Sequence, residues 1–214
     1  MSKTTFKLLP ILAAGLALSS CGGGTRLDDL GGVYTERSLC PQLGIPAATG
    51  DITLFHAGGT AANYLDVTAT ITNLRAQCYD SGTELVSSAT YDIVAQRREA
   101  GPARTVTFPV YNVAMQGGDA VVAKRVGQVA VNFENGQLMG QASASSSVRV
   151  DRAAVTLPEN VRQELTRKRK AGEVDAAIDP LTQPAIRQAV ARATFEHLVG
   201  FQLTQDQLRY NATR

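Results

Sequence analysis

The stretch Leu65-Asp66-Val67-Thr68-Ala69-Thr70-Ile71-Thr72 decides the fold of this chain. Apolar and polar residues alternate through it, so the apolar side chains face one way and the polar side chains face the other. A strand with this period of two buries one face and leaves the other in solvent, whereas an amphipathic helix needs a period of about 3.6 residues. The stretch therefore predicts a half-buried β-strand.

The same alternation recurs along the chain between Asp51 and Pro158. Further apolar faces are formed by Leu85, Ala89, Tyr91 and Ile93 and by Val129, Val131 and Phe133. Turn residues separate these runs at Asp80-Ser81-Gly82, Gly101-Pro102, Gly117-Gly118-Asp119 and Glu134-Asn135-Gly136. About six or seven strands with one apolar face each predict two antiparallel sheets packed face to face, in a mostly β domain. Their spacing matches an immunoglobulin-like or fibronectin-like sandwich, although tryptophan is absent and the cysteines are placed differently from the immunoglobulin pair.

Pro109 lies inside the strand pattern of residues 105–113. A proline cannot donate a hydrogen bond to a neighbouring strand, so we expect this strand to be an edge strand or to carry a bulge. As an edge strand, it could add to the sheet of a partner protein.

The pattern changes to helix after Pro158, a residue that suits the first position of a helix. Glu159 lies at the positive end of this first helix, Arg167-Lys168-Arg169-Lys170 lie at its negative end, and Gly172 stops it. The sequence therefore predicts a β-sandwich domain over residues 40–157 and a C-terminal helical segment over residues 158–214.

A second helix is expected from Pro184 to a C-terminal cap at Gly200. Its apolar stripe must be buried against the sandwich of the same chain or against a partner protein. The stripe consists of Ile186, Ala189, Val190, Ala193 and His197, with Thr194, Leu198 and Phe201 beside it.

The N-terminus has the layout of a secretory signal peptide. Lys3 and Lys7 precede an apolar run from Leu8 to Leu18, and small residues follow. This run is too short to span a bilayer comfortably, which needs about 20 apolar residues. We therefore expect residues 1–20 to be a signal peptide that directs the chain out of the cytoplasm.

The segment Leu18-Ser19-Ser20-Cys21 resembles the lipobox of bacterial lipoproteins. The resemblance implies that Cys21 is diacylated, becomes the first residue of the mature protein and anchors it to a membrane. Gly22 follows where an aspartate is the usual signal for retention in the inner membrane. The resemblance thus implies an outer-membrane lipoprotein that faces the periplasm, with residues 21–39 as a lipidated, flexible tether.

Cys40 and Cys78 are the cysteines that remain after lipidation of Cys21. Two thiols in an oxidising compartment are expected to form a disulfide. The alternatives are two free thiols or a metal-binding pair, but no histidine or further cysteine lies at ligand spacing from either residue. We expect a disulfide that fixes the start of the folded domain.

The charge of the mature chain is balanced. The whole chain has 21 basic and 19 acidic residues, and loss of Lys3 and Lys7 with the signal peptide leaves 19 of each. Binding of nucleic acid requires a basic surface that neutralises phosphates, so we expect no nucleic-acid partner.

Motifs that carry catalysis are missing from the sequence. There is no Gly-x-Ser-x-Gly, Ser-x-x-Lys, phosphate loop or dinucleotide glycine fingerprint. His197 lacks the second histidine of a zinc protease motif and is interpreted as a packed helix residue, while His56 ends a strand-like run. A hydrolase would need His56 to meet a nucleophile and a carboxylate in the fold. We expect a protein that is not an enzyme and holds no metal or cofactor.

A basic cluster comprises Arg162, Arg167, Lys168, Arg169 and Lys170. It could contact anionic headgroups or polysaccharide phosphate, because each cation near an anionic membrane contributes about 1 kcal/mol. The alternative is a solvated helix end, since nearby glutamates such as Glu164 dilute the positive field.

Three further segments extend the resemblance to the mature chain: Cys40-Pro41, Ala76-Gln77-Cys78 and Val199-Gly200-Phe201. Together with the lipobox, they resemble small envelope lipoproteins of Gram-negative, alphaproteobacterial-type cells, a group without an assigned activity. The resemblance implies a location and no reaction. We expect a structural or assembly module of the cell envelope with an envelope protein as its partner. The alternative is a lipid- or glycan-binding module that uses the basic cluster and a pocket between sandwich and helix.

Overall fold

A computed structural model describes residues 25–27, 33–35, 37–167, 172 and 178–213. The chain forms two compact units, Met1–Ser38 and Leu39–Arg214. In the first unit, strands β1 (Thr25–Leu27) and β2 (Val33–Thr35) pair antiparallel. Sequence analysis expected a flexible tether over residues 21–39 and did not predict this strand pair. The expected signal peptide and Cys21 lie outside the described residues.

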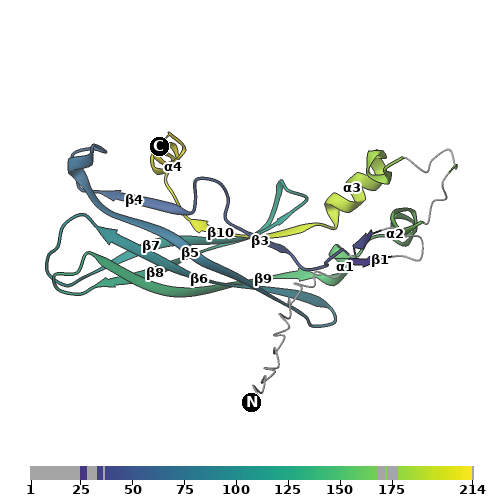
Figure 1. Cartoon of the computed structure of the whole chain (residues 1–214), viewed down its shortest axis with the longest axis horizontal. Coiled ribbons are helices and arrows are strands. Elements are labelled where there is room, and N and C mark those ends of the chain that lie inside the picture. The colour runs from purple at the N-terminus through teal and green to yellow at the C-terminus, as the bar shows by residue number, and fades with distance from the viewer. Residues whose placement is uncertain (1–24, 28–32, 36, 168–171, 173–177, 214) are drawn as a thin grey trace, which may run out of the picture. The chain divides into compact units, whose positions relative to one another are not determined.

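The second unit contains two four-stranded sheets (Figure 1). One sheet has the order β4-β5-β6-β9, and its strands are Asp51–Phe55, Leu65–Asp80, Glu84–Arg97 and Met139–Asp151. The other has the order β3-β10-β7-β8, and its strands are Gln42–Gly44, Phe195–Phe201, Arg104–Gln116 and Ala120–Phe133. All neighbouring strands run antiparallel except β3 and β10, which are parallel.

The main core lies between these sheets, where the alternating sequence predicted it. Val67, Ala69 and Ile71 of β5 are at most 5 % exposed. They pack with residues from the other strands that were expected to face inward, among them Ala89, Tyr91, Ile93, Val131 and Phe133. The mostly β sandwich predicted from the period of two is thus confirmed.

The connections between strands follow the predicted turns. In the β5–β6 turn, Gly82 has φ +91° and its N–H donates to Asp80 Oδ1 at 2.9 Å. Between β7 and β8, Gly117 and Gly118 both have positive φ, a conformation that glycine adopts without a steric cost. Strand β6 pairs with β9, and β7 pairs with β10. These pairings between non-consecutive strands are Greek-key connections, as in immunoglobulin-like sandwiches.

The strand that contains Pro109 is not an edge strand, but it carries the bulge that was the alternative expectation. Strand β7 lies between β10 and β8, and its register shift falls at Ala114 and Met115. Pairing with β10 ends at Val110, and the Pro109 carbonyl then accepts a hydrogen bond from the Gln202 N–H at 2.9 Å. The nitrogen and carbonyl of one strand residue point to the same side. The nitrogen of Pro109, which has no hydrogen to donate, therefore points to a position just beyond the end of β10. No residue of β10 needs a hydrogen bond from it there.

The second predicted helix is only partly correct. Helix α3 (Pro184–Arg192) begins at Pro184 as expected, but it ends well before Gly200. The residues that follow form strand β10, in which Phe195, His197, Val199 and Phe201 are buried. The C-terminal segment 158–214 thus contains a strand of the sandwich. The apolar residues in this region fit the helical period of about 3.6 as well as the strand period of two. The segment forms a strand because it pairs with β3 on one side and with β7 on the other.

Helices bury further apolar residues outside the main core. Helix α1 (Arg152–Val155) continues from β9 and buries Val155 in a small cluster with Leu85, Val150 and Phe195. Helix α2 (Glu159–Thr166) and α3 share a cluster of Val161, Ile186 and Ala189, so the stripe of α3 is covered by the same chain. Short 3-10 helices occupy Ala62–Tyr64 and Pro180–Thr182, and helix α4 (Gln205–Thr213) follows β10.

Candidate functional site

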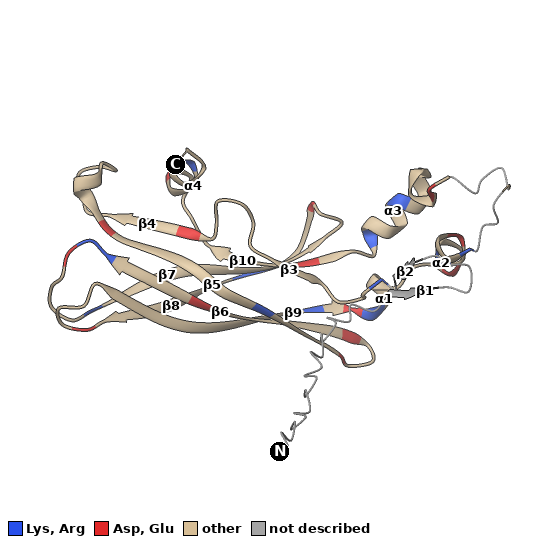
Figure 2. Cartoon of the chain, viewed as in Figure 1, with Lys and Arg blue, Asp and Glu red and all other residues tan. Residues whose placement is uncertain are grey.

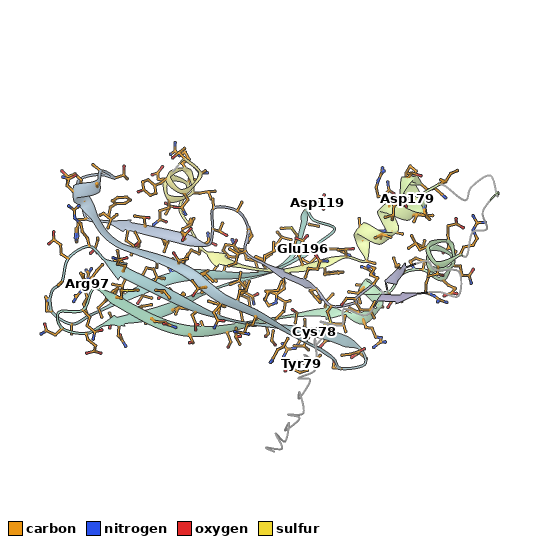
Figure 3. All side chains as sticks on the ribbon, in the orientation of Figure 1. Cys78, Tyr79, Arg97, Asp119, Asp179 and Glu196 are labelled. Atoms are coloured by element: carbon orange, nitrogen blue, oxygen red, sulfur yellow. A yellow bond between two sulfur atoms is a disulfide. The ribbon has the colours of Figure 1, made fainter. Side chains whose placement is uncertain are left out.

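The disulfide predicted between Cys40 and Cys78 is present, with sulfur atoms 2.08 Å apart and Cα atoms 6.1 Å apart. It connects the first residues of the second unit to the C-terminal half of β5. Figure 3 places Cys78 and Arg97 towards opposite ends of the long strands. The bridge therefore joins residues at the end of the sandwich that is remote from Arg97.

The basic cluster is largely neutralised in the part of it that the structure describes. Arg162 donates to Glu159 through Nε and Nη2 at 2.8 and 2.6 Å, and Arg167 lies 3.5 Å from Glu164. These pairs connect residues one helical turn apart. Lys168, Arg169 and Lys170 lie outside the described residues. Each described arginine of the cluster thus faces a carboxylate of its own helix.

A pocket of about 330 Å³ lies around His56 at the sandwich end marked by Arg97. His56 Nε2 is 3.5 Å from Asp66 Oδ1, and the guanidinium of Arg104 binds the same carboxylate. No serine, threonine or cysteine is among the described residues that line the pocket. The histidine and carboxylate of a hydrolase therefore meet here, but no hydroxyl or thiol nucleophile joins them.

Arg97 is a buried residue that binds the loops at this end of the sandwich. Its side chain is 2 % exposed, and it donates to the carbonyls of Gln137, Pro102, Gly101 and Glu134 at 2.5 to 3.1 Å. Its guanidinium also lies 5.5 Å from the centre of the Phe133 ring. Arg97 thus holds together the β6–β7 and β8–β9 loops and has a structural role.

His197 is a core residue of β10 and belongs to no helix. It is fully buried, with Nδ1 3.0 Å from Ser87 Oγ and Nε2 3.4 Å from Ser146 Oγ. Burial lowers its pKa to about 4. Because neither Ser87 nor His197 reaches solvent, this serine–histidine contact has no access for a substrate.

A second pocket lies between sandwich and helix, where the alternative function would place a ligand. It is formed by the β5–β6 turn, α1 and the residues before α2, and its charged lining residues are Glu84, Asp151 and Arg152. Neither Arg162 nor Arg167 lines it. The pocket and the described part of the basic cluster are therefore separate features.

The exposed half of β8 is the most unusual surface of the described residues. Residues 120–128 are exposed on both faces of the strand, and Val121, Val122 and Val126 are 57, 49 and 56 % exposed. β8 is an edge strand, so no strand of the described residues pairs with one side of its backbone. Edge strands with exposed apolar side chains are sites at which another strand can pair.

Strand β9 contributes only small side chains to the interior beside β8. Opposite the buried side chains of β6, β9 presents Gly140, Ala142, Ala144 and Ser146 to the interior. At Gly140, β9 packs closely against β8, because a Cβ there would lie 2.5 Å from the Asn132 carbonyl oxygen. Sequence analysis missed the surface because it used only Val129, Val131 and Phe133 of this strand. The signal that could have found it is Val121-Val122, which breaks the alternation.

The exposed half of β8 is also positively charged. β8 contains Lys124 and Arg125 and no acidic residue (Figure 2). Lys124 Nζ lies 5.5 Å from the centre of the Tyr111 ring, and within the described part of the chain neither cation forms an ion pair. The edge is thus apolar and basic.

Comparison with known proteins finds no matching family model, no matching curated protein and no matching solved structure. Among the described residues, no helix is long and apolar enough to cross a membrane. The class that the fold itself defines is a disulfide-linked β-sandwich with Greek-key connections and C-terminal helices.

Proposed function

We propose that this chain is a membrane-anchored lipoprotein that faces the periplasm, where it serves as a structural or assembly module of the cell envelope. The observation that carries the interaction role is the edge of β8, which is exposed on both faces over residues 120–128. The anchor rests on the lipobox-like segment Leu18-Ser19-Ser20-Cys21. The disulfide between Cys40 and Cys78 supports an oxidising compartment.

The features of the second unit favour binding over catalysis. The histidine of the end pocket lacks a nucleophile among its described neighbours, and the buried His197 lacks access. A sandwich with an edge strand that is exposed on both faces suits a protein that holds another protein in place. In this arrangement, the acyl group at Cys21 keeps the sandwich near the membrane.

The anchor is tested with the Cys21→Ser substitution in cells. We expect the unchanged chain to incorporate labelled palmitate and to fractionate with membranes, and C21S to do neither. The C40S/C78S double variant is the matched control, because it removes two other cysteines and leaves the lipobox intact. Palmitate incorporation by C21S, or its absence from the unchanged chain, would refute the anchor.

The interaction role is tested by a photo-crosslinking amino acid placed at Val126. The control position is Thr72, which is exposed on the outer face of the opposite sheet. We expect a discrete adduct with an envelope protein from position 126, absent from position 72 and lost when C21S removes the anchor. Equal adducts from both positions would contradict a specific role for β8.

A further inference from the structure

We propose that the free edge of β8 binds an extended acidic segment of a partner protein as an additional strand of the β3-β10-β7-β8 sheet. This inference rests on the proposed interaction role and names the partner's chemistry. It is carried by the backbone of β8, by the side chains around Val126 and by the charge of the edge.

The geometry of Pro109 identifies which backbone groups of β8 face outward. The Pro109 carbonyl points towards Gln202, away from β8. Pro109 is opposite Gln128, so this is a pair without hydrogen bonds between β7 and β8, and the Gln128 N–H and C=O point away from β7. Because these directions alternate along a strand, Val126 and Lys124 also direct their N–H and C=O to the free edge. Arg125 and Gly127 direct theirs to β7.

The side chains of β8 determine which sequence of a partner strand can pair with its free edge. Lys124 and Val126 lie on the outer face of the sheet with Tyr111, whereas Arg125 lies on the inner face. Residues directly opposite each other in adjacent strands interact, and opposite charges there are favourable. An added strand therefore needs two adjacent acidic residues, one opposite Lys124 and one opposite Arg125, with an apolar residue opposite Val126.

A second copy of the chain meets these requirements poorly. Pairing two β8 edges would bring both copies of Lys124 and Arg125 to one seam, and β8 supplies no acidic residue to balance them. Like charges across strands are destabilising. The chemistry of the edge thus favours a different, acidic segment over self-association.

The test uses the purified full chain carrying Cys21→Ser and three short synthetic peptides. The peptides alternate threonine and valine around a central Glu-Glu, Gln-Gln or Lys-Lys pair. Amide hydrogen exchange is followed residue by residue by NMR. With the Glu-Glu peptide, we expect slower exchange at Lys124, Val126 and Gln128 and no change at Arg125 and Gly127, which already bond to β7.

Affinities provide the second readout. We expect the Glu-Glu peptide to bind about three- to tenfold more tightly than the Gln-Gln peptide at low salt, with the difference shrinking as salt rises. The K124E/R125E variant should reverse the preference and favour the Lys-Lys peptide. The matched control R149E changes an exposed arginine on the other sheet and should leave the preference unchanged.

Three outcomes would overturn the proposal. They are equal binding of the three peptides, protection at Arg125 and Gly127 in place of their neighbours, and protection that rises with protein concentration without peptide. The last result would indicate a second copy as the occupant. None of these results affects palmitate incorporation at Cys21, so failure here is separable from failure of the proposed anchor.

Discussion

Replacing His197 by glutamine should remove part of the acid sensitivity of this protein. His197 is fully buried between the sheets and contacts Ser87 and Ser146. Its burial disfavours the charged imidazolium and lowers the pKa from 6.5 to about 4. The side chain is therefore neutral in the folded protein at neutral pH.

The magnitude follows from the difference in proton binding between the two states. Below pH 6.5 the unfolded chain protonates His197, whereas the folded protein does so only below about pH 4. Between these values the unfolded state binds more protons, so the free energy of unfolding falls as the pH falls. A shift of this size corresponds to about 3 kcal/mol, lost between pH 6.5 and pH 4.

The assay is urea unfolding of the oxidised protein at several pH values from 7.5 to about 4. We expect H197Q to lose about 3 kcal/mol less than the unchanged chain over this range, whatever its stability at pH 7.5. The control H56Q replaces the only other histidine, which is 62 % exposed, and should keep the pH dependence. Identical pH slopes for H197Q and the unchanged chain would refute the assignment.

Three further predictions concern stability, and each is checked by thermal or urea unfolding. C40S/C78S should lower the free energy of unfolding by about 2–5 kcal/mol, and the unchanged chain under reducing conditions should match it; a smaller loss would contradict a constraining bridge. R97M should cost about 3 kcal/mol or more because four loop carbonyls lose their donor, and an R97M protein as stable as the unchanged chain would refute the clamp. G200A should cost about 1–3 kcal/mol because its Cβ would lie 2.5 Å from Thr49 Oγ1 and 2.6 Å from the Tyr111 hydroxyl. The control G127A meets no atom within 4 Å and should be nearly neutral, so equal effects of the two alanines would exclude the clash.

Local signals in the sequence were sufficient for part of the C-terminal region. Pro184 correctly marked the start of α3. A capping box also announces α4, which sequence analysis did not predict: the Thr204 N–H donates to Gln207 Oε1 at 2.9 Å, and the Gln207 N–H donates to Thr204 Oγ1 at 3.2 Å. The signal for this helix is therefore local, although its docking is not: Asn211 Nδ2 donates to the carbonyls of Ala48 and Asp51.

The surface of β8 depends on residues far away in the sequence. Val126 lies on the outer face of β8, opposite Tyr111 of β7, and it is exposed because β8 is the last strand of its sheet among the described residues. Pro109 is tolerated inside a central strand only because β10 ends at Phe201, which pairs with Val110. No residue of β10 therefore needs the N–H that Pro109 lacks. Neither fact is encoded in the residues of one strand alone.

The sequence by itself determined the two-sheet class, the inward faces of β5 and β6, the turn positions and the cysteine pair. These features depend on the period of two and on residue chemistry within short segments. Only the tertiary structure decided that residues 195–201 form a strand and that the edge strand β8 is exposed on both faces over residues 120–128. An apolar segment whose pattern fits both a helix and a strand forms the structure that its neighbours in space can pair with. The exposure of an edge strand likewise depends on which other segments of the fold pack against it.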